Sequence, residues 1–152
     1  MVKVPDTSPA QLKLFVGYSR FECALKECGY VVPKAGIAHA DWKRFAGEEC
    51  LKDVMEIASD DADVKEMIAD PPATQVTDGD GTWRWAAQIE APIDALGQFF
   101  EAVKQVRDNL FHGGKHGENR ERDDTLCRAA WVVLELCAER HPEVGSIFEY
   151  KY

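Results

Sequence analysis

Apolar residues recur at helical spacing near the start of the chain and predict its first element. Between residues 14 and 28 they fall at intervals of three and four, which gives a helix one apolar face. The members of this stripe are Leu14, Tyr18, Phe21, Leu25 and Cys28. Ser8 can cap such a helix, and Pro9 fits its first turn. Gly29 is a typical helix end, so we expect a helix from about residue 9 to residue 28.

The same pattern predicts four more helices and one loop. Helices are expected at about 40–58, 61–69, 93–112 and 123–140. The stripe over 93–112 is heptad-like, which is typical of a helix packed lengthwise on a partner; it comprises Leu96, Phe99, Val103, Val106 and Leu110. Residues 70–82 read as a loop, with a tight turn over residues 78–81. The pattern predicts one all-α domain, residues 1–152, built as a bundle of four main helices plus short helices.

Aromatic residues flank these helices. Trp83 and Trp85 follow the loop and are predicted to be core or interface anchors. Pro142 is expected to end the last helix. The aromatic tail after it is expected to dock on the surface or on a neighbouring subunit; its members are Phe148, Tyr150 and Tyr152.

Composition narrows the class of protein. Of 152 residues, 45% are hydrophobic and 30% charged, which is ordinary for a globular protein and unlike a disordered chain. No apolar run approaches the roughly 20 residues of a membrane span, and the first residues lack the apolar region of a secretory signal. The five cysteines include no CxxC pair, so reduced thiols and a cytoplasmic location are expected.

The distribution of charge leaves room for one basic site. A net charge of −9 argues against a general nucleic-acid binder, which normally presents a basic face. The window 104–122, however, holds five basic and three acidic residues, a net of +2, so the rest of the chain carries −11. The acidic excess lies largely in residues 41–80. A local phosphate site in the basic window is one interpretation, and a solvated charged loop is the other.

An arginine and a histidine stand close together at the end of the predicted helix over 93–112. Arg107 is a permanent cation, and His112 can move protons near neutral pH. Residues five apart differ by about 140° in direction on an ideal helix. Asp108 and His112 are four apart and share a face. We therefore expect Asp108 to orient the imidazole and Arg107 to reach in from the neighbouring face.

These residue types suit RNA cleavage without a metal. His112 would take the proton from a 2′-hydroxyl, which attacks the neighbouring phosphorus. Arg107 would neutralise the phosphate as charge develops. Three further residues are candidate substrate-binding groups: Asn109, Lys115 and Arg120. No metal or other cofactor is expected, because the HxxxH spacing that ends at His116 has no accompanying cysteine pair.

The run Arg-Asp-x-x-x-His over residues 107–112 resembles the Arg-x4–6-His motif of the HEPN superfamily. The helical order and the glycines at 113–114 are also similar to that family. The resemblance implies a homodimer that joins two motifs in a cleft, and a metal-independent endoribonuclease acting on RNA. Toxin–antitoxin or phage-defence systems, with an antitoxin or regulatory protein as partner, are then expected. Gly114 stands where one toxin subgroup has a modified tyrosine, so that regulation is not expected here.

Two other interpretations remain open. Some HEPN-like proteins are non-catalytic modules that bind nucleotide, RNA or a partner protein, and this chain could be one of them. A helical interaction protein is the third possibility, with Trp83, Trp85 and Tyr150 mediating assembly. Glu22 on the first helix is a candidate partner for Arg107, with a plain surface ion pair as the alternative.

Overall fold

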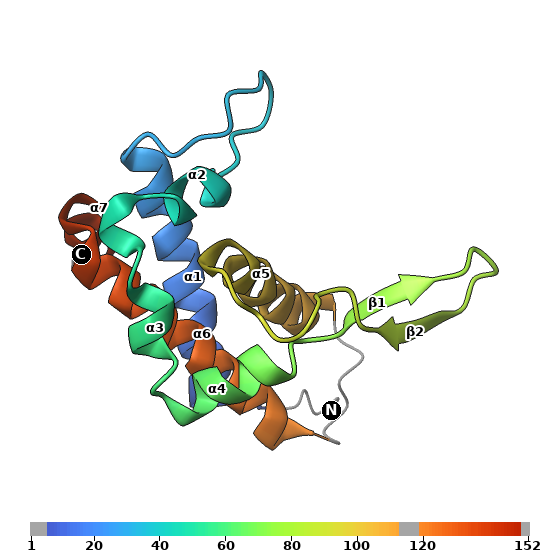
Figure 1. Ribbon diagram of the computed structural model, residues 1–152. Helices are drawn as coiled ribbons and strands as arrows, with labels where there is room; N and C mark the ends of the chain where they lie inside the picture. The colour runs from blue at the N-terminus through green and yellow to red at the C-terminus, as the bar shows by residue number, and fades with distance from the viewer. Residues whose placement is uncertain (1–5, 113–118, 150–152) are drawn as a thin grey trace.

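The computed structural model describes residues 6–112 and 119–149, and helices dominate it (Figure 1). In chain order the helices are α1 (Pro9–Glu27), α2 (Trp42–Ala46), the 3-10 helix η1 (Glu49–Leu51), α3 (Val54–Ala58), α4 (Ala62–Ala69), α5 (Leu96–His112), α6 (Arg120–Arg140) and α7 (Pro142–Phe148). Strands β1 (Thr74–Thr77) and β2 (Trp83–Ala86) form a small antiparallel hairpin. The mainly helical class is confirmed.

Helix α1 begins where the sequence predicts. The Ser8 hydroxyl accepts the Gln11 N–H at 3.2 Å, and the Gln11 side chain accepts the Ser8 N–H at 3.1 Å. This reciprocal pair satisfies two N–H groups that the first turn leaves free. The Ser8 hydroxyl also donates to Asp124 on α6 at 2.5 Å. The cap therefore joins the starts of the two helices as well as opening α1.

The predicted helix over 40–58 is wrong: three short helical pieces occupy this stretch. Gly47 ends α2, and Glu48 is extended, with ψ of 134°. These changes of direction carry Phe45, Leu51 and Val54 into the core, where each is at most 2% exposed. A single straight helix lacks the changes of direction at Gly47 and Glu48 with which these three side chains reach the core. Tertiary packing therefore overrides the helical periodicity here.

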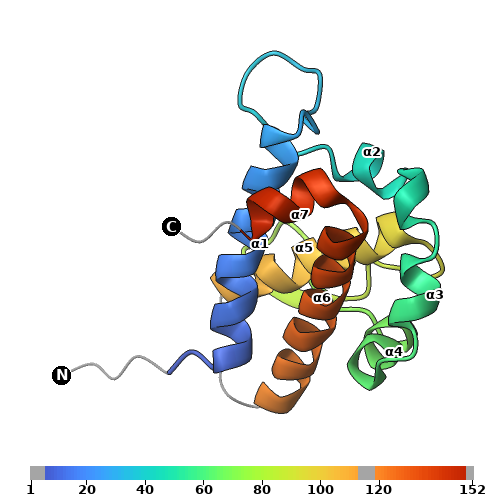
Figure 2. The same cartoon turned by 90° about the vertical axis from the view of Figure 1, so that its left-hand side faces the viewer.

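Three long helices form the centre of the molecule. Helices α1 and α6 run side by side, α5 crosses behind them, and α3 and α4 pack against α6 (Figure 2). The stripe expected on α5 is buried at Phe99 and Val103, which meet residues such as Val133 and Leu134 of α6 in one core. The remaining helices have eight residues or fewer. The described residues therefore have three long helices, the short helices also supply core residues, and a bundle of four main helices is not confirmed.

The hairpin projects from the helical body (Figure 1). The tight turn expected at 78–81 is confirmed, since Gly79 and Gly81 both have φ of +87°, which L side chains rarely adopt. The strands on either side of the turn were not predicted. Trp83 is 54% exposed and makes a ring contact with Trp85. A core role for Trp83 is therefore wrong.

The chain after α6 turns back onto the core. Pro142 begins α7 instead of merely ending α6, and the ring of His141 accepts the N–H of Val144. Phe148 is 8% exposed and packs against Phe21 and Trp131. It is a core residue, while the other two tail aromatics, Tyr150 and Tyr152, lie outside the described residues. Within the described ranges, no helix has the length and apolar character to cross a membrane.

Candidate functional site

Arg107 lies on α5 and is held from two directions. Its Nη1 forms an ion pair with Asp108 Oδ1 at 2.9 Å, and its guanidinium lies 4.8 Å from the ring centre of Tyr18 on α1. The side chains of Arg107 and Asp108 are each 28% exposed. The Nε atom of Arg107 is buried and has no hydrogen-bond partner among the described residues. The cation is thus fixed in position, with part of its donor set still unused.

Helix α1 supports Arg107 through a second layer of contacts. Tyr18 is 4% exposed, and its hydroxyl donates to Glu22 Oε1 at 3.3 Å. The indole N–H of Trp42 donates to the same oxygen at 3.4 Å. Glu22, the expected partner of Arg107, therefore reaches it mainly through the tyrosine and through its charge. The described residues include no direct ion pair between Glu22 and Arg107.

The pKa values of Tyr18 and Arg107 are both raised, which keeps the tyrosine neutral and the arginine charged. Burial raises the pKa of Tyr18 to about 12, and Arg107 opposes that rise in part. Burial alone would lower the pKa of Arg107. The hydrogen bond with Tyr18 and the carboxylates of Asp108 and Glu22 outweigh it, so the pKa is raised. At neutral pH the site holds a cation beside a neutral phenol.

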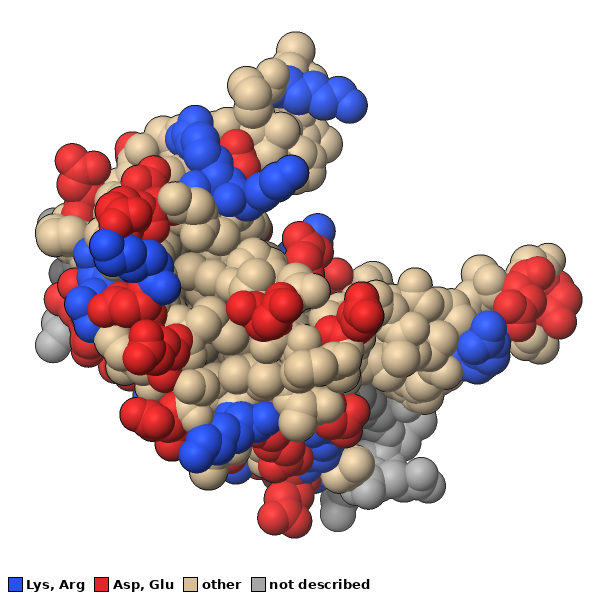
Figure 3. Space-filling model, in the orientation of Figure 1, with Lys and Arg blue, Asp and Glu red and all other residues tan. Residues whose placement is uncertain are grey.

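A cleft of about 320 Å³ opens beside Arg107, between α1, α2 and α5. The charges that line it are mixed: three cations and three carboxylates take part, and His39 lines the cleft as well. These are Lys43, Lys104 and Arg107, and Glu22, Asp41 and Glu101. Figure 3 shows basic side chains over α2 and the loop before it, and acidic ones at the tip of the hairpin. A phosphate in this cleft is therefore attracted where it lies close to one of the three cations, and the cleft as a whole has no positive excess from these six groups.

His112 is the last residue of α5 and is exposed to solvent. It is not one of the residues that line the cleft beside Arg107. The structure differs from the expectation that Asp108 orients His112: the carboxylate binds Arg107, and the described residues include no hydrogen bond between Asp108 and His112. A carboxylate binds a charged guanidinium more strongly than a neutral imidazole. The arginine side chain is also long enough to fold back onto Asp108, the next residue in the chain.

The structure places the expected substrate-binding residues in different surroundings. Asn109 is 5% exposed: its Oδ1 accepts from Gln105 at 2.8 Å, and its Nδ2 donates to the Ala73 carbonyl at 2.8 Å. It therefore ties α5 to the residue before β1, which differs from the expectation of a free donor for phosphate or ribose. Arg120 opens α6 and donates to the Asp6 carbonyl at 3.3 Å. Lys115 lies outside the described residues.

Sequence reasoning assigned Tyr18 only to the core, and that burial is confirmed. Its second role, beneath the Arg107 guanidinium, depends on how α1 meets α5 and has no local signal. The spacing of four residues between Tyr18 and Glu22 predicts only the contact of these two side chains with each other on α1. The described residues hold no group of three or more metal-ligating side chains placed to bind an ion.

Comparison of this chain with protein-family models, with curated proteins and with solved structures finds no match. The likeness to HEPN proteins therefore rests on the six-residue motif and on the order of helices around it. Function has to be argued from the site itself.

Proposed function

We propose that this chain is a metal-independent endoribonuclease of HEPN type. The observation that carries the proposal is the placing of Arg107 and His112 on one helix: the first fixed and partly buried, the second exposed at the helix end. A fixed cation and a solvent-accessible imidazole are the two groups that 2′-hydroxyl attack on a phosphodiester requires. A cytoplasmic toxin or defence enzyme, controlled by an antitoxin or other regulatory protein, is the setting that the resemblance implies.

The residues have distinct roles in this reaction. His112 accepts the proton of the 2′-hydroxyl, and the 2′-oxygen attacks the adjacent phosphorus. The bond to the 5′-oxygen breaks, that oxygen takes up a proton, and a 2′,3′-cyclic phosphate and a 5′-hydroxyl result. Arg107 holds the non-bridging oxygens while negative charge grows on them. Before RNA binds, Asp108 forms an ion pair with the guanidinium of Arg107, and the phosphate competes with it for this group.

Helix geometry favours a site completed by two copies of the chain. Five residues of α-helix give about 7.5 Å of rise and about 140° of rotation. A phosphate on the Arg107 side of α5 therefore does not face His112 of the same helix. A second copy that brings its own His112 to this phosphate completes the site, in keeping with the homodimer that the resemblance implies.

One observation favours a non-catalytic alternative. Arg107 is already engaged by Asp108 and Tyr18, and an arginine satisfied within its own chain can serve to join two helices. In that case the cleft beside it binds a nucleotide, RNA or a partner protein without cleaving anything. Cleavage assays separate the two functions.

The test is RNA cleavage in EDTA by the wild type and by His112→Ala. We expect the wild type to leave 2′,3′-cyclic phosphate ends and the variant to lose about 100-fold or more of the rate, as removal of a general base does. Circular dichroism checks that the variant is folded, which the exposure of His112 favours. His39→Ala tests the exposed histidine that lines the cleft. Loss of cleavage there, but not in His112→Ala, would move the base to His39. Intact RNA with a well-folded wild type supports the binding module.

A further inference from the structure

His39 stands at the foot of the loop that joins α1 to α2, where the two sides of the loop are bonded to each other. The N–H of Val32 donates to the carbonyl of His39 at 2.9 Å, and Val31 and Ala40 form an antiparallel bridge next to this bond. The loop extends beyond the end of α1 (Figure 2). Its foot is held, so the backbone that carries His39 has a defined place beside the cleft that Arg107 lines.

The imidazole of His39 is exposed and has no hydrogen bond or ion pair with any residue that the structure describes. His141 differs, because both of its ring nitrogens are engaged: Nε2 lies 2.9 Å from the Tyr30 hydroxyl, and Nδ1 accepts the N–H of Val144 at 3.4 Å. Among the described histidines, His39 and His112 are therefore the two whose rings can exchange protons with a ligand.

The proposed cleavage needs a proton donor as well as a base. His112 takes the proton of the 2′-hydroxyl, but the 5′-oxygen leaves as an alkoxide unless another group protonates it while its bond to phosphorus breaks. In a displacement in line, the entering and leaving oxygens lie on opposite sides of phosphorus. His112 does not line the cleft. With the 2′-oxygen and its base outside the cleft, the 5′-oxygen points into it.

The cleft holds one residue type suited to protonate that oxygen. Carboxylic acids have ordinarily lost their protons at neutral pH, and lysine ammonium groups release theirs only in strong alkali. Two carboxylates of the cleft are also occupied as acceptors: Glu22 binds the Tyr18 hydroxyl, and Asp41 binds the N–H of Arg44 at 3.0 Å. An imidazole exchanges protons near neutral pH, and His39 supplies it.

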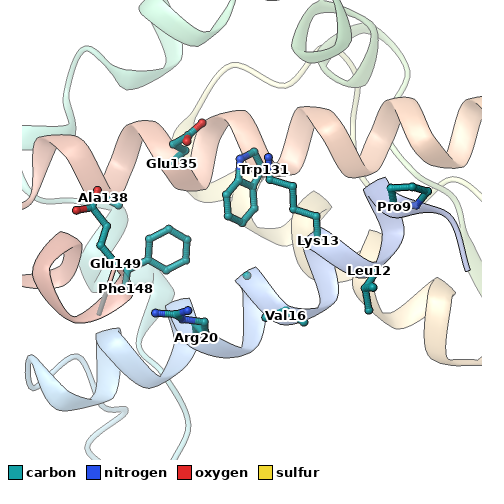
Figure 4. A pocket seen from close by; sticks show the side chains of 11 residues that line it. Pro9, Leu12, Lys13, Val16, Arg20, Trp131, Glu135, Ala138, Phe148 and Glu149 are labelled. Atoms are coloured by element: carbon teal, nitrogen blue, oxygen red, sulfur yellow. The ribbon is translucent and has the colours of Figure 1, made fainter. Parts of the chain in front are cut away.

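A second, larger groove lacks these groups. It measures about 730 Å³ and lies between α1, α6 and α7 (Figure 4). Lys13 lies over the ring of Trp131 in this groove, 4.5 Å from the ring centre. Neither an imidazole nor Arg107 is among the described residues that line it. The larger groove therefore offers no proton donor to a leaving oxygen.

We propose that the cleft beside Arg107 receives the nucleotide on the 3′ side of the cut, and that His39 is the general acid that protonates its 5′-oxygen; this assignment rests on the proposed function. As the 2′-oxygen attacks, the bond from phosphorus to the 5′-oxygen breaks, and the imidazolium of His39 gives that oxygen its proton. His39 ends neutral and His112 ends protonated, and exchange with water restores both. At about 320 Å³ the cleft is at the small end of ligand pockets, which suits one nucleotide of a single strand.

The test compares ordinary RNA with RNA in which sulfur replaces the 5′-oxygen at the cut. A thiol is a far stronger acid than an alcohol, so the sulfur leaves without a donated proton. We expect His39→Ala to cut ordinary RNA about 100-fold more slowly or worse and the sulfur substrate at close to the wild-type rate. His112→Ala should be slow on both substrates, because the 2′-hydroxyl still needs a base.

Lys34→Ala is the matched control. It removes an exposed side chain from the same loop, and Lys34 is not among the residues that line the cleft. Both of its cleavage rates should equal those of the wild type. His39→Gln, which keeps a polar side chain but has no proton to transfer near neutral pH, should behave as His39→Ala does. Circular dichroism checks that each variant is folded.

The dependence of kcat on pH is a second readout, which a merely structural side chain would not change. The charged groups that line the cleft with His39 are Glu22, Asp41, Lys43, Glu101, Lys104 and Arg107. A general acid has to carry its proton, so the wild-type kcat should fall towards high pH, as His39 loses it. His39→Ala should lack this fall, whereas His112→Ala should lack the decline towards low pH.

The possible failures are distinct. If His39→Ala slows both substrates equally, or cuts ordinary RNA as fast as the wild type, His39 is not the acid, while the nuclease stands. The same conclusion follows if His39→Ala keeps the fall of kcat towards high pH. A well-folded wild type that leaves RNA intact in EDTA overturns the nuclease and the acid together.

Discussion

Replacing Asp108 with asparagine distinguishes two roles for this carboxylate. In the structure its Oδ1 is bound to Arg107 Nη1 at 2.9 Å, so it competes with a phosphate for the guanidinium. Asparagine keeps the size and polarity of the side chain and removes its charge. We therefore expect Asp108→Asn to bind RNA more tightly than the wild type.

The size of the effect follows from the exposure of the pair. Both side chains are 28% exposed, which puts them between surface pairs, worth about 0–1 kcal/mol, and fully buried pairs, worth several times more when one partner is removed. A pair worth about 1 kcal/mol changes a dissociation constant about fivefold. The KM for RNA should fall by that factor, while kcat should stay near the wild-type value, because Arg107 and His112 are both retained.

The measurement is the dependence of the initial cleavage rate on RNA concentration, at one fixed low salt concentration. Removing any negative charge from an acidic protein favours RNA binding to some extent, so a matched control is needed. Asp94→Asn removes the same charge two residues before α5, where Asp94 is exposed. The effect of Asp108→Asn should clearly exceed that of Asp94→Asn.

A fall in kcat with little change in KM would refute this account of Asp108. That result is expected if the carboxylate orients His112 during catalysis, since an amide holds an imidazolium far less well. An unchanged KM and an unchanged kcat would show instead that Arg107 does not bind the phosphate.

Further predictions concern the stability of the fold, each measured by urea unfolding. Gly145→Ala should cost about 1–3 kcal/mol, because its Cβ would lie 2.2 Å from the Ala138 carbonyl oxygen, whereas Gly97→Ala, with no atom nearer than 3.9 Å, should gain about 0.5–1 kcal/mol. The pKa of Tyr18 is raised from 10.0 to about 12. The contribution of the neutral phenol to the free energy of unfolding is therefore complete below pH 10 and is lost as the pH rises through 12. The loss amounts to about 2–3 kcal/mol, and Tyr18→Phe should remove this part of the alkaline decline. Asn109→Ala should cost about 1–3 kcal/mol with an unchanged m value, since it leaves the partly buried Ala73 carbonyl without its partner.

The elements that the sequence predicts correctly are those with local signals. Helix α1 has a capping residue, a proline in its first turn and an uninterrupted apolar stripe, and its start is found to the residue. Helix α5 has a stripe of the same kind. Both stripes are buried because each helix is long enough to lie along a neighbour.

The elements that it misses depend on the rest of the molecule. The stretch 40–58 has good helical periodicity, but its apolar residues pack only if the chain changes direction at Gly47 and Glu48. The strands of the hairpin have four residues each, and a hairpin this short is marginal on its own. Asn109 lies beside the end of this hairpin, since its amide donates to the residue before β1.

The candidate site shows the same division. The sequence places Arg107 and His112 on one helix, with His112 at its end, and the structure confirms this. Whether Asp108 pairs with Arg107 or with His112 depends on which side chain reaches the carboxylate, and in the structure it is Arg107. The burial of Asn109 depends on a residue 36 positions away, and the place of Tyr18 under Arg107 depends on the crossing of two helices. No local pattern encodes either contact.

The tryptophan pair of the hairpin gives the molecule an optical signal of its own. The rings of Trp83 and Trp85 have centroids 5.7 Å apart and planes at 87° to each other. Two indoles so close and so oriented couple their electronic transitions, which gives an exciton couplet in the circular dichroism spectrum. Both indoles stand on β2, so the couplet reports on the hairpin strand that carries them, whereas the amide bands report mainly on the helices. Opening of the hairpin can thus be followed apart from unfolding of the helical body, as a local transition of low free energy.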